Sequence, residues 1–227
     1  MVNFITLGLL AMATGSLAVP TNPNPSPSTT SSTPAPTPDT QTLYEELFSS
    51  PSALGRYKLL LTDPKTGGLL PTDALRKNIA FDFNGQGTLD PGDKGGKLTA
   101  AVAATFPILV DQDISTVTAF LNPCSILVPH THPQIESLVV AQGNLTTGTL
   151  IPNLVGPGQG TGEIVLNLSQ YQGTVFPAGA IHYQMNPTCQ PAVFISSLSS
   201  SDPGTTLEST FFSLSGNVSP PQLFISI

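Results

Sequence analysis

The chain has 227 residues, enough for one domain with a sizeable core or for two small ones. Only 9% of the residues are charged, against about 25% in an ordinary soluble domain, and 20 glycines with 23 prolines favour turns and strands over long surface helices. A net charge of −7 disfavours nucleic acid as a partner, because binding phosphates needs a cationic face.

Residues 1–18 are predicted to be a signal peptide. The apolar run from Phe4 to Ala18 ends in Ser16-Leu17-Ala18, with small residues where a signal peptidase reads the chain. The run is too short for a comfortable membrane span, and no second long apolar segment follows. We therefore expect cleavage near Ala18 and a secreted chain without a membrane anchor, rather than a buried N-terminal strand.

Residues 19–40 are predicted to be a disordered linker. They alternate Pro with Ser and Thr and contain too few large apolar residues to offset the entropy of ordering. In a secreted protein this composition indicates an extended linker with sites for O-glycosylation. Three N-glycosylation sequons agree with secretion, although such sequons also arise by chance. They begin at Asn144, Asn167 and Asn217.

Residues 41–78 are predicted to form a short helical extension, with all the helices of the chain inside 41–62. Thr42 and Glu45 have the spacing of a capping box, and Leu43 and Leu47 are four residues apart, as on one face of a helix.

Residues 79–227 are predicted to form a single all-β domain. About nine short β-rich runs follow one another with turn residues between them and no helical pattern, which favours an antiparallel sandwich or barrel. The predicted strands are Ile79–Phe83, Leu98–Val110, Ser115–Leu121, Glu136–Ala141, Gly162–Leu168, Thr174–Phe176, Ala180–Gln184, Ala192–Leu198 and Thr210–Leu214. All seven Lys and Arg residues lie between positions 56 and 97, so a positive charge within 98–227 must come from a metal ion or a protonated histidine.

The three histidines of the chain predict a metal site. His130 and His132 are separated by one residue, so on a strand both side chains leave the same face and can chelate one ion. Pro133 ends that strand, and Glu136 can then return from the next strand as an oxygen ligand. His182 comes just after Pro177-Ala178-Gly179, a sequence that suits a tight turn.

The same strand pairing predicts a disulfide bond. Facing residues of an antiparallel pair have residue numbers with a constant sum, and this sum is almost the same for His130 with His182 as for Cys124 with Cys189. A bulge at Pro187 would absorb the one-residue difference. A secretory route permits a Cys124–Cys189 bond, and the alternative is two reduced, buried thiols.

The motifs resemble the cupin superfamily, most closely its secreted germin-like and spherulin-like branch. The run from His130 to Glu136 with Gly143 is similar to the first cupin motif, and the run from Gly173 to Asn186 is similar to the second. Gly95–Ala101 and Phe120–Cys124 extend the resemblance. It implies a cupin jelly roll that often assembles into homo-oligomers. It also implies one divalent ion, usually manganese, held by the residues His130, His132, Glu136 and His182, with Asn186 supporting these ligands from outside the coordination sphere.

Three imidazoles and one carboxylate leave up to two octahedral positions open, which suits Mn²⁺, or Fe²⁺ as second choice, better than a closed structural zinc. Leu127 stands three residues before His130, where oxalate-oxidising germins have a substrate-holding Asn, and an apolar side chain cannot donate a hydrogen bond. Oxalate oxidation is therefore disfavoured.

Two functions stay open. The chain is either a secreted manganese enzyme, such as a superoxide dismutase or another oxidoreductase of small oxygen-containing ligands, or a non-enzymatic metal-binding glycoprotein of a cell wall or spore coat. Sugar binding is disfavoured, because the chain has no Trp and only four Tyr to stack on a ring.

Overall fold

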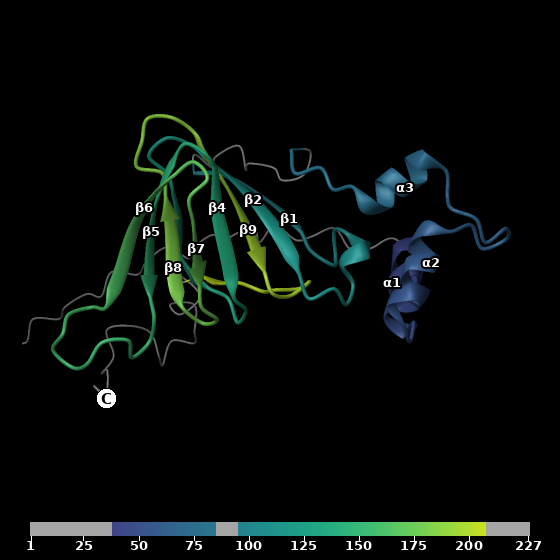
Figure 1. Cartoon of the computed structure of the whole chain (residues 1–227), viewed down its shortest axis with the longest axis horizontal. Helices are drawn as coiled ribbons and strands as arrows, with labels where there is room; N and C mark the ends of the chain where they lie inside the picture. The colour runs from purple at the N-terminus through teal and green to yellow at the C-terminus, as the bar shows by residue number, and fades with distance from the viewer. Residues whose placement is uncertain (1–37, 85–94, 208–227) are drawn as a thin grey trace, which may run out of the picture. The chain divides into compact units, whose positions relative to one another are not determined.

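The computed structural model describes residues 38–84 and 95–207 (Figure 1). The predicted signal peptide, the linker before Pro38, the strand expected at Thr210–Leu214 and the sequon at Asn217 lie outside these residues.

Residues 38–84 form three helices: α1 (Pro38–Ser49), α2 (Ala53–Leu61) and α3 (Thr72–Ile79). Helix α1 begins four residues before Thr42, so the predicted capping box is wrong. The side chain of Ser52 caps α2, because its Oγ accepts a hydrogen bond of 3.0 Å from the Gly55 amide.

Helix α3 contradicts two predictions, since it lies outside 41–62 and ends at Ile79, where a strand was expected to begin. Asp73 in its first turn and Arg76 and Lys77 in its last turn complement the helix dipole and stabilise this short helix.

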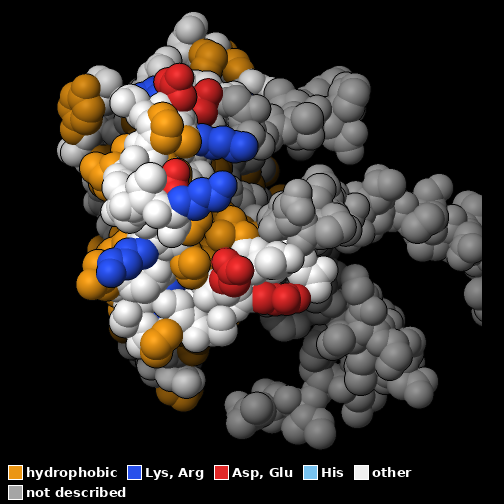
Figure 2. Space-filling model, turned by 90° about the vertical axis from the view of Figure 1, so that its right-hand side faces the viewer, with side chains coloured by type: hydrophobic (Ala, Val, Ile, Leu, Met, Phe, Trp, Pro, Cys, Tyr) orange, Lys and Arg blue, Asp and Glu red, His pale blue; other side chains and the backbone are white. Residues whose placement is uncertain are grey.

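The helices share a small apolar cluster with the segment that follows the first strand. Leu47 and Leu60 are buried there against Ala103 and Val110. The Tyr44 hydroxyl donates to the Ala103 carbonyl at 2.7 Å. Figure 2 shows basic, acidic and hydrophobic side chains intermixed over the face it presents.

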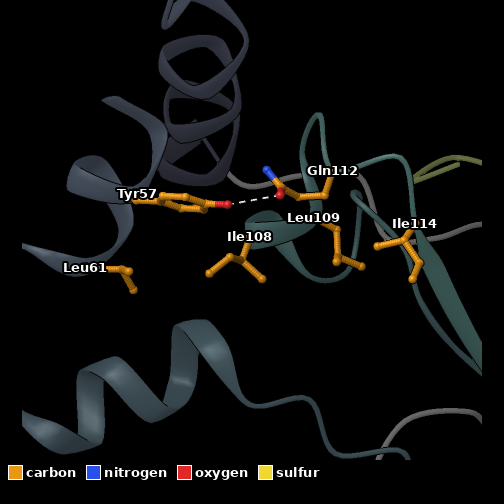
Figure 3. A pocket seen from close by; sticks show the side chains of 6 residues that line it. All are labelled: Tyr57, Leu61, Ile108, Leu109, Gln112 and Ile114. Carbon is orange, nitrogen blue, oxygen red and sulfur yellow. Dashed lines mark hydrogen bonds between the residues drawn. The ribbon is translucent and has the colours of Figure 1, made fainter. Parts of the chain in front are cut away.

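An open groove lies between α2 and the 3₁₀ helix η1 (Pro107–Leu109), where Tyr57 donates to Gln112 Oε1 at 3.0 Å (Figure 3). Its lining is largely apolar and consists of Tyr57, Leu61, Ile108, Leu109, Gln112 and Ile114.

Within the described residues, ten strands form two five-stranded antiparallel sheets, which confirms the all-β prediction. The strand orders are β1-β2-β9-β4-β7 and β10-β3-β8-β5-β6. The strands are β1 (Gly96–Ala101), β2 (Ser115–Leu121), β3 (Ile126–Thr131), β4 (Glu136–Gln142), β5 (Asn144–Leu150), β6 (Glu163–Ser169), β7 (Gly173–Phe176), β8 (Ile181–Met185), β9 (Ala192–Leu198) and β10 (Thr206–Leu207).

Strands β2 and β9 match their predicted bounds, whereas the strand expected at Leu98–Val110 ends at Ala101. Strand β5 was not predicted, because its Thr-rich run around Gly148 lacks apolar alternation. Gly148 is required by close packing, since a Cβ there would lie 2.1 Å from the ring of Tyr183.

The main core lies between the two sheets. It consists of Ala119, Leu121, Leu138, Val140, Leu145, Leu168, Phe176 and Phe194, and Leu127 packs against it. Core residues alternate with outward-facing ones along each strand. A polar side chain at an inward-facing position of β4 or β8 therefore also points into the interior.

Candidate metal centre

The structure brings the four predicted ligands together from three strands. His130 lies on β3 and His132 directly after it, Glu136 is the first residue of β4, and His182 lies on β8. One nitrogen or oxygen atom from each side chain lies within 4.8 Å of the other three. All four side chains are buried, with residue exposures between 2% and 8%.

The register of β3 and β8 places His130 opposite His182, as the constant-sum argument predicts. An irregularity in this pair lies between Leu127 and His130. The pairing ends at Ile126 and Met185, so the bulge expected at Pro187 stays a prediction. A register shift next to His130 is typical of β-bulges, which bend a strand locally and are common near functional sites.

Backbone carbonyls fix the tautomer of all three imidazoles. Each Nδ1 lies next to a carbonyl oxygen, which can only accept a hydrogen bond, so each Nδ1 has a proton, and a neutral ring of this tautomer presents the lone pair of Nε2 to the site. The carbonyls belong to Val128, Gly204 and Ala180, at 2.8 Å from His130, 2.5 Å from His132 and 2.9 Å from His182. Metal-binding histidines are held in this way.

The carboxylate of Glu136 faces these lone pairs. Its Oε2 lies 3.1 Å from Nε2 of His182 and 3.3 Å from Nε2 of His132. Acceptors this close repel one another unless a proton or a cation is shared between them. The donor set therefore fits a divalent metal ion, and metal would supply the positive charge that this group of acceptors requires.

Phe176 holds the ring of His182 from one side. Their ring centroids are 4.2 Å apart and the planes differ by 10°. Together with the Ala180 carbonyl, this stacking limits His182 to one orientation.

The protonation states at neutral pH suit metal binding. Burial lowers the pKa of His130 from 6.5 to about 4, and this outweighs the opposing effect of the Val128 carbonyl. The pKa of Glu136 lies below its ordinary value of 4.5. Burial raises it, but the neighbouring side chains of His182 and Ser196 more than offset this effect. His130 is thus neutral and Glu136 ionised.

We expect the metal-free protein to lose stability as the pH falls from about 6.5 to 4. Unfolded His130 binds a proton in this range and folded His130 does not, so acid favours unfolding, by roughly 3 kcal/mol in total. Urea unfolding in a chelator at several pH values measures the effect. The His130→Gln variant should show a shallower slope, and an unchanged slope would contradict the low pKa.

Asn186 does not support the ligands, contrary to the expectation from the resemblance. Its Nδ2 donates to the carbonyls of Asn122 at 2.9 Å and Gln190 at 2.8 Å, and its Oδ1 accepts from the Thr188 hydroxyl at 2.9 Å. Since these partners lie in the loops that contain the two cysteines, Asn186 holds those loops together rather than the metal ligands.

The two cysteines are free and exposed, so the alternative of buried thiols is wrong and the Cys124–Cys189 bond stays a prediction. The Cys124 amide donates to the carbonyl of Thr188 at 3.0 Å, so the two cysteine loops lie side by side. Asn144 and Asn167 are exposed, as a glycosylation site requires, and their modification also stays a prediction.

Sequence reasoning missed two buried polar side chains on the same inner face as His182. Gln184 follows His182 by two residues, and Thr147 pairs with Gln184 across β5 and β8. The two-residue spacing from His182 was the available signal.

No helix within 38–84 or 95–207 is long and apolar enough to cross a membrane.

Comparisons with known proteins all indicate the same family. A family model described as Cupin matches residues 86–223. Spherulin-1B of Physarum polycephalum is 33% identical over 80% of this chain and 66% of its own length, so the chain spans about two thirds of that relative. A germin-like protein of Mesembryanthemum crystallinum is 33% identical over 72% of each chain.

The fold is that of a cupin jelly roll, as the resemblance implied. A solved structure of recombinant oxalate oxidase in complex with glycolate is similar, with a TM-score of 0.51 and 20% identity over 67% of this chain and 75% of that one. At this identity the likeness concerns the fold alone.

Proposed function

Since the chain belongs to the cupin family, within its germin-like and spherulin-like branch, we propose that it is a secreted manganese protein that reacts with superoxide or another small oxygen-containing molecule. The observation that supports this most is the buried group of three imidazoles and one carboxylate, whose donor atoms converge within 4.8 Å.

The donor set favours a reactive metal over a structural one. Four protein donors leave up to two positions of an octahedral ion for small ligands, whereas structural zinc sites are closed by four ligands. Bound manganese would supply one-electron redox chemistry. The chain itself orients the imidazoles, keeps His130 neutral and Glu136 ionised, and restricts access by burying all four side chains.

Leu127 argues against oxalate as the substrate, although a structural neighbour is an oxalate oxidase. Its apolar side chain packs against the main core and provides no hydrogen bond to a carboxylate. From residue 98 onward the sequence has no Lys or Arg, so only the metal attracts a dianion.

The test is elemental analysis of the secreted, unchelated protein combined with a superoxide-consumption assay on the same sample. We expect near-stoichiometric manganese and activity above that of free manganese ion, with both lost in His130→Ala. Protein that contains manganese but is no more active than the free ion would contradict the enzymatic proposal.

A second function is metal binding for stability or storage in a cell wall or spore coat. Burial of all four donors favours it, because an enzyme needs its metal to be reached by substrate. In this case, replacing His130 and His132 by Ala lowers thermal stability but leaves the wall phenotype intact. Loss of the phenotype in a variant that still folds would contradict it. Secretion, glycosylation and homo-oligomer formation belong to both proposals.

A further inference from the structure

We propose that the hydroxyl of Ser196 donates a hydrogen bond to the carboxylate of Glu136 and holds this predicted metal ligand in the orientation that binds the ion. Ser196 is then a positioning residue, which acts from outside the coordination sphere. The inference rests on the metal binding proposed above. It concerns how the chain keeps the one acidic member of the four predicted ligands in place.

Ser196 occupies an inward-facing position of β9 where the strand pattern predicts an apolar residue. Buried residues alternate along β9 with half-buried or exposed ones, and the other three buried residues are apolar. They are Ala192, Phe194 and Leu198. Ser196 is only 2% exposed. A buried hydroxyl destabilises the folded chain unless it has a hydrogen-bond partner, so Ser196 needs an acceptor nearby.

Strand pairing brings Ser196 next to Glu136. Strand β9 lies beside β4, where Leu198 pairs with Glu136 and Ser196 pairs with Leu138. Ser196 is therefore a diagonal neighbour of Glu136 on the inner face, and a long side chain can reach such a neighbour. The two groups are close enough to interact electrostatically, since Ser196 is one of the side chains that lower the pKa of the Glu136 carboxyl group.

The strand neighbours of Ser196 do not provide an acceptor. Its partner on β4 is Leu138 and its partner on β2 is Val117, and both side chains are apolar. The buried Oγ of Ser196 has no hydrogen bond of ordinary geometry within the described residues. A hydroxyl hydrogen can rotate toward an acceptor, and a charged carboxylate is a stronger acceptor than a neutral oxygen. The carboxylate of Glu136 therefore satisfies this hydroxyl best.

This hydrogen bond opposes rotation of the carboxylate away from the site. Oε2 of Glu136 lies 3.1 Å from Nε2 of His182 and 3.3 Å from Nε2 of His132. Without a cation these nitrogens and the carboxylate oxygen repel one another as acceptors. A donor on the carboxylate keeps it in place against this repulsion, so the site is already arranged when the ion arrives. Groups that orient metal ligands in this way raise the metal affinity.

The experiment is a titration of the metal-free protein with Mn²⁺. We expect Ser196→Ala to bind manganese about tenfold more weakly, as for the loss of a group that supports a ligand. Ser115→Ala is the matched control and should bind as the unchanged protein does. Ser115 is 0% exposed and its Oγ also has no hydrogen bond within the described residues. Leu198 lies between Ser115 and Glu136 in the sheet, so Ser115 is one strand farther away.

Two larger variants separate the hydrogen bond from packing. Thr and Val have nearly the same shape, but only Thr has a hydroxyl. We expect Ser196→Thr to bind manganese about tenfold more tightly than Ser196→Val, whereas a residue that only fills space gives equal affinities. Urea unfolding of each metal-free variant shows that it folds. If neither larger variant folds, Ser196→Ala and Ser115→Ala decide.

The proposal is overturned if Ser196→Ala binds manganese as tightly as the unchanged protein, or if the Thr and Val variants fold and bind it equally. An equal loss in Ser115→Ala also overturns it, because the effect would then not depend on closeness to Glu136. Unchanged protein that does not bind manganese contradicts the proposed function itself. Unchanged protein that binds manganese, with no effect at Ser196, contradicts only the positioning role.

Discussion

Replacing Glu136 by Gln is expected to lower the affinity for manganese more than about 100-fold. The loss of a group that only supports a ligand from outside the coordination sphere lowers metal affinity about 10–100-fold, and Glu136 is itself a predicted ligand. The substitution keeps the shape of the side chain but removes the only negative charge among the four ligands. It also replaces the charged carboxylate oxygen by a neutral amide oxygen, which is a weaker donor for manganese. Elemental analysis after dialysis against a weak chelator measures the loss.

The same substitution should not destabilise the metal-free protein. Oε2 of Glu136 faces two imidazole nitrogens at 3.1 and 3.3 Å, and a Gln amide at this position can donate a hydrogen bond to one of them. Glu163→Gln is the matched control, because Glu163 is exposed at the start of β6 and its carboxylate accepts from the Tyr183 hydroxyl, not from an imidazole of the site. A Glu136→Gln variant that retains stoichiometric manganese would show that these four residues do not form the binding site.

The sequence predicted the members of the site because their spacing follows the two-residue period of a strand. His130 and His132 had to leave one face, and antiparallel pairing then placed His182 opposite His130. The groups that orient the imidazoles could not be predicted in this way. The acceptor for His132 is the carbonyl of Gly204, 72 residues away in the chain, and any residue type provides a carbonyl.

Fold predictions failed where local patterns were short or polar. Helix α3 has eight residues and too few apolar positions to show a helical period, so the sequence predicts a strand that begins at Ile79, where the helix ends. Strand β5 is rich in Thr, and Thr147 faces the interior although a polar residue is normally expected to face solvent. Tertiary packing decides the secondary structure of such segments, and a single sequence does not show this packing.

The loops of the two cysteines are already held together without a covalent bond. The Cys124 backbone has a φ of 55°, an uncommon value for a residue other than Gly, and its amide donates to Thr188 at 3.0 Å. Asn186 bonds to the carbonyls of Asn122 and Gln190 on the two sides. A bond between the sulfurs would therefore join segments that the fold brings together in any case.

Oxidation of Cys124 and Cys189 is expected to stabilise the protein by about 4 kcal/mol, because the bond closes a loop of about 65 residues and restricts the unfolded chain. The two thiols give two electrons and two protons to an oxidised thiol such as glutathione disulfide, which becomes two reduced molecules. Urea unfolding with and without reductant measures the difference. Reduction should leave the Cys124→Ser variant unaffected. Because both thiols are exposed, alkylation of the unreduced native protein at both cysteines would contradict the bond.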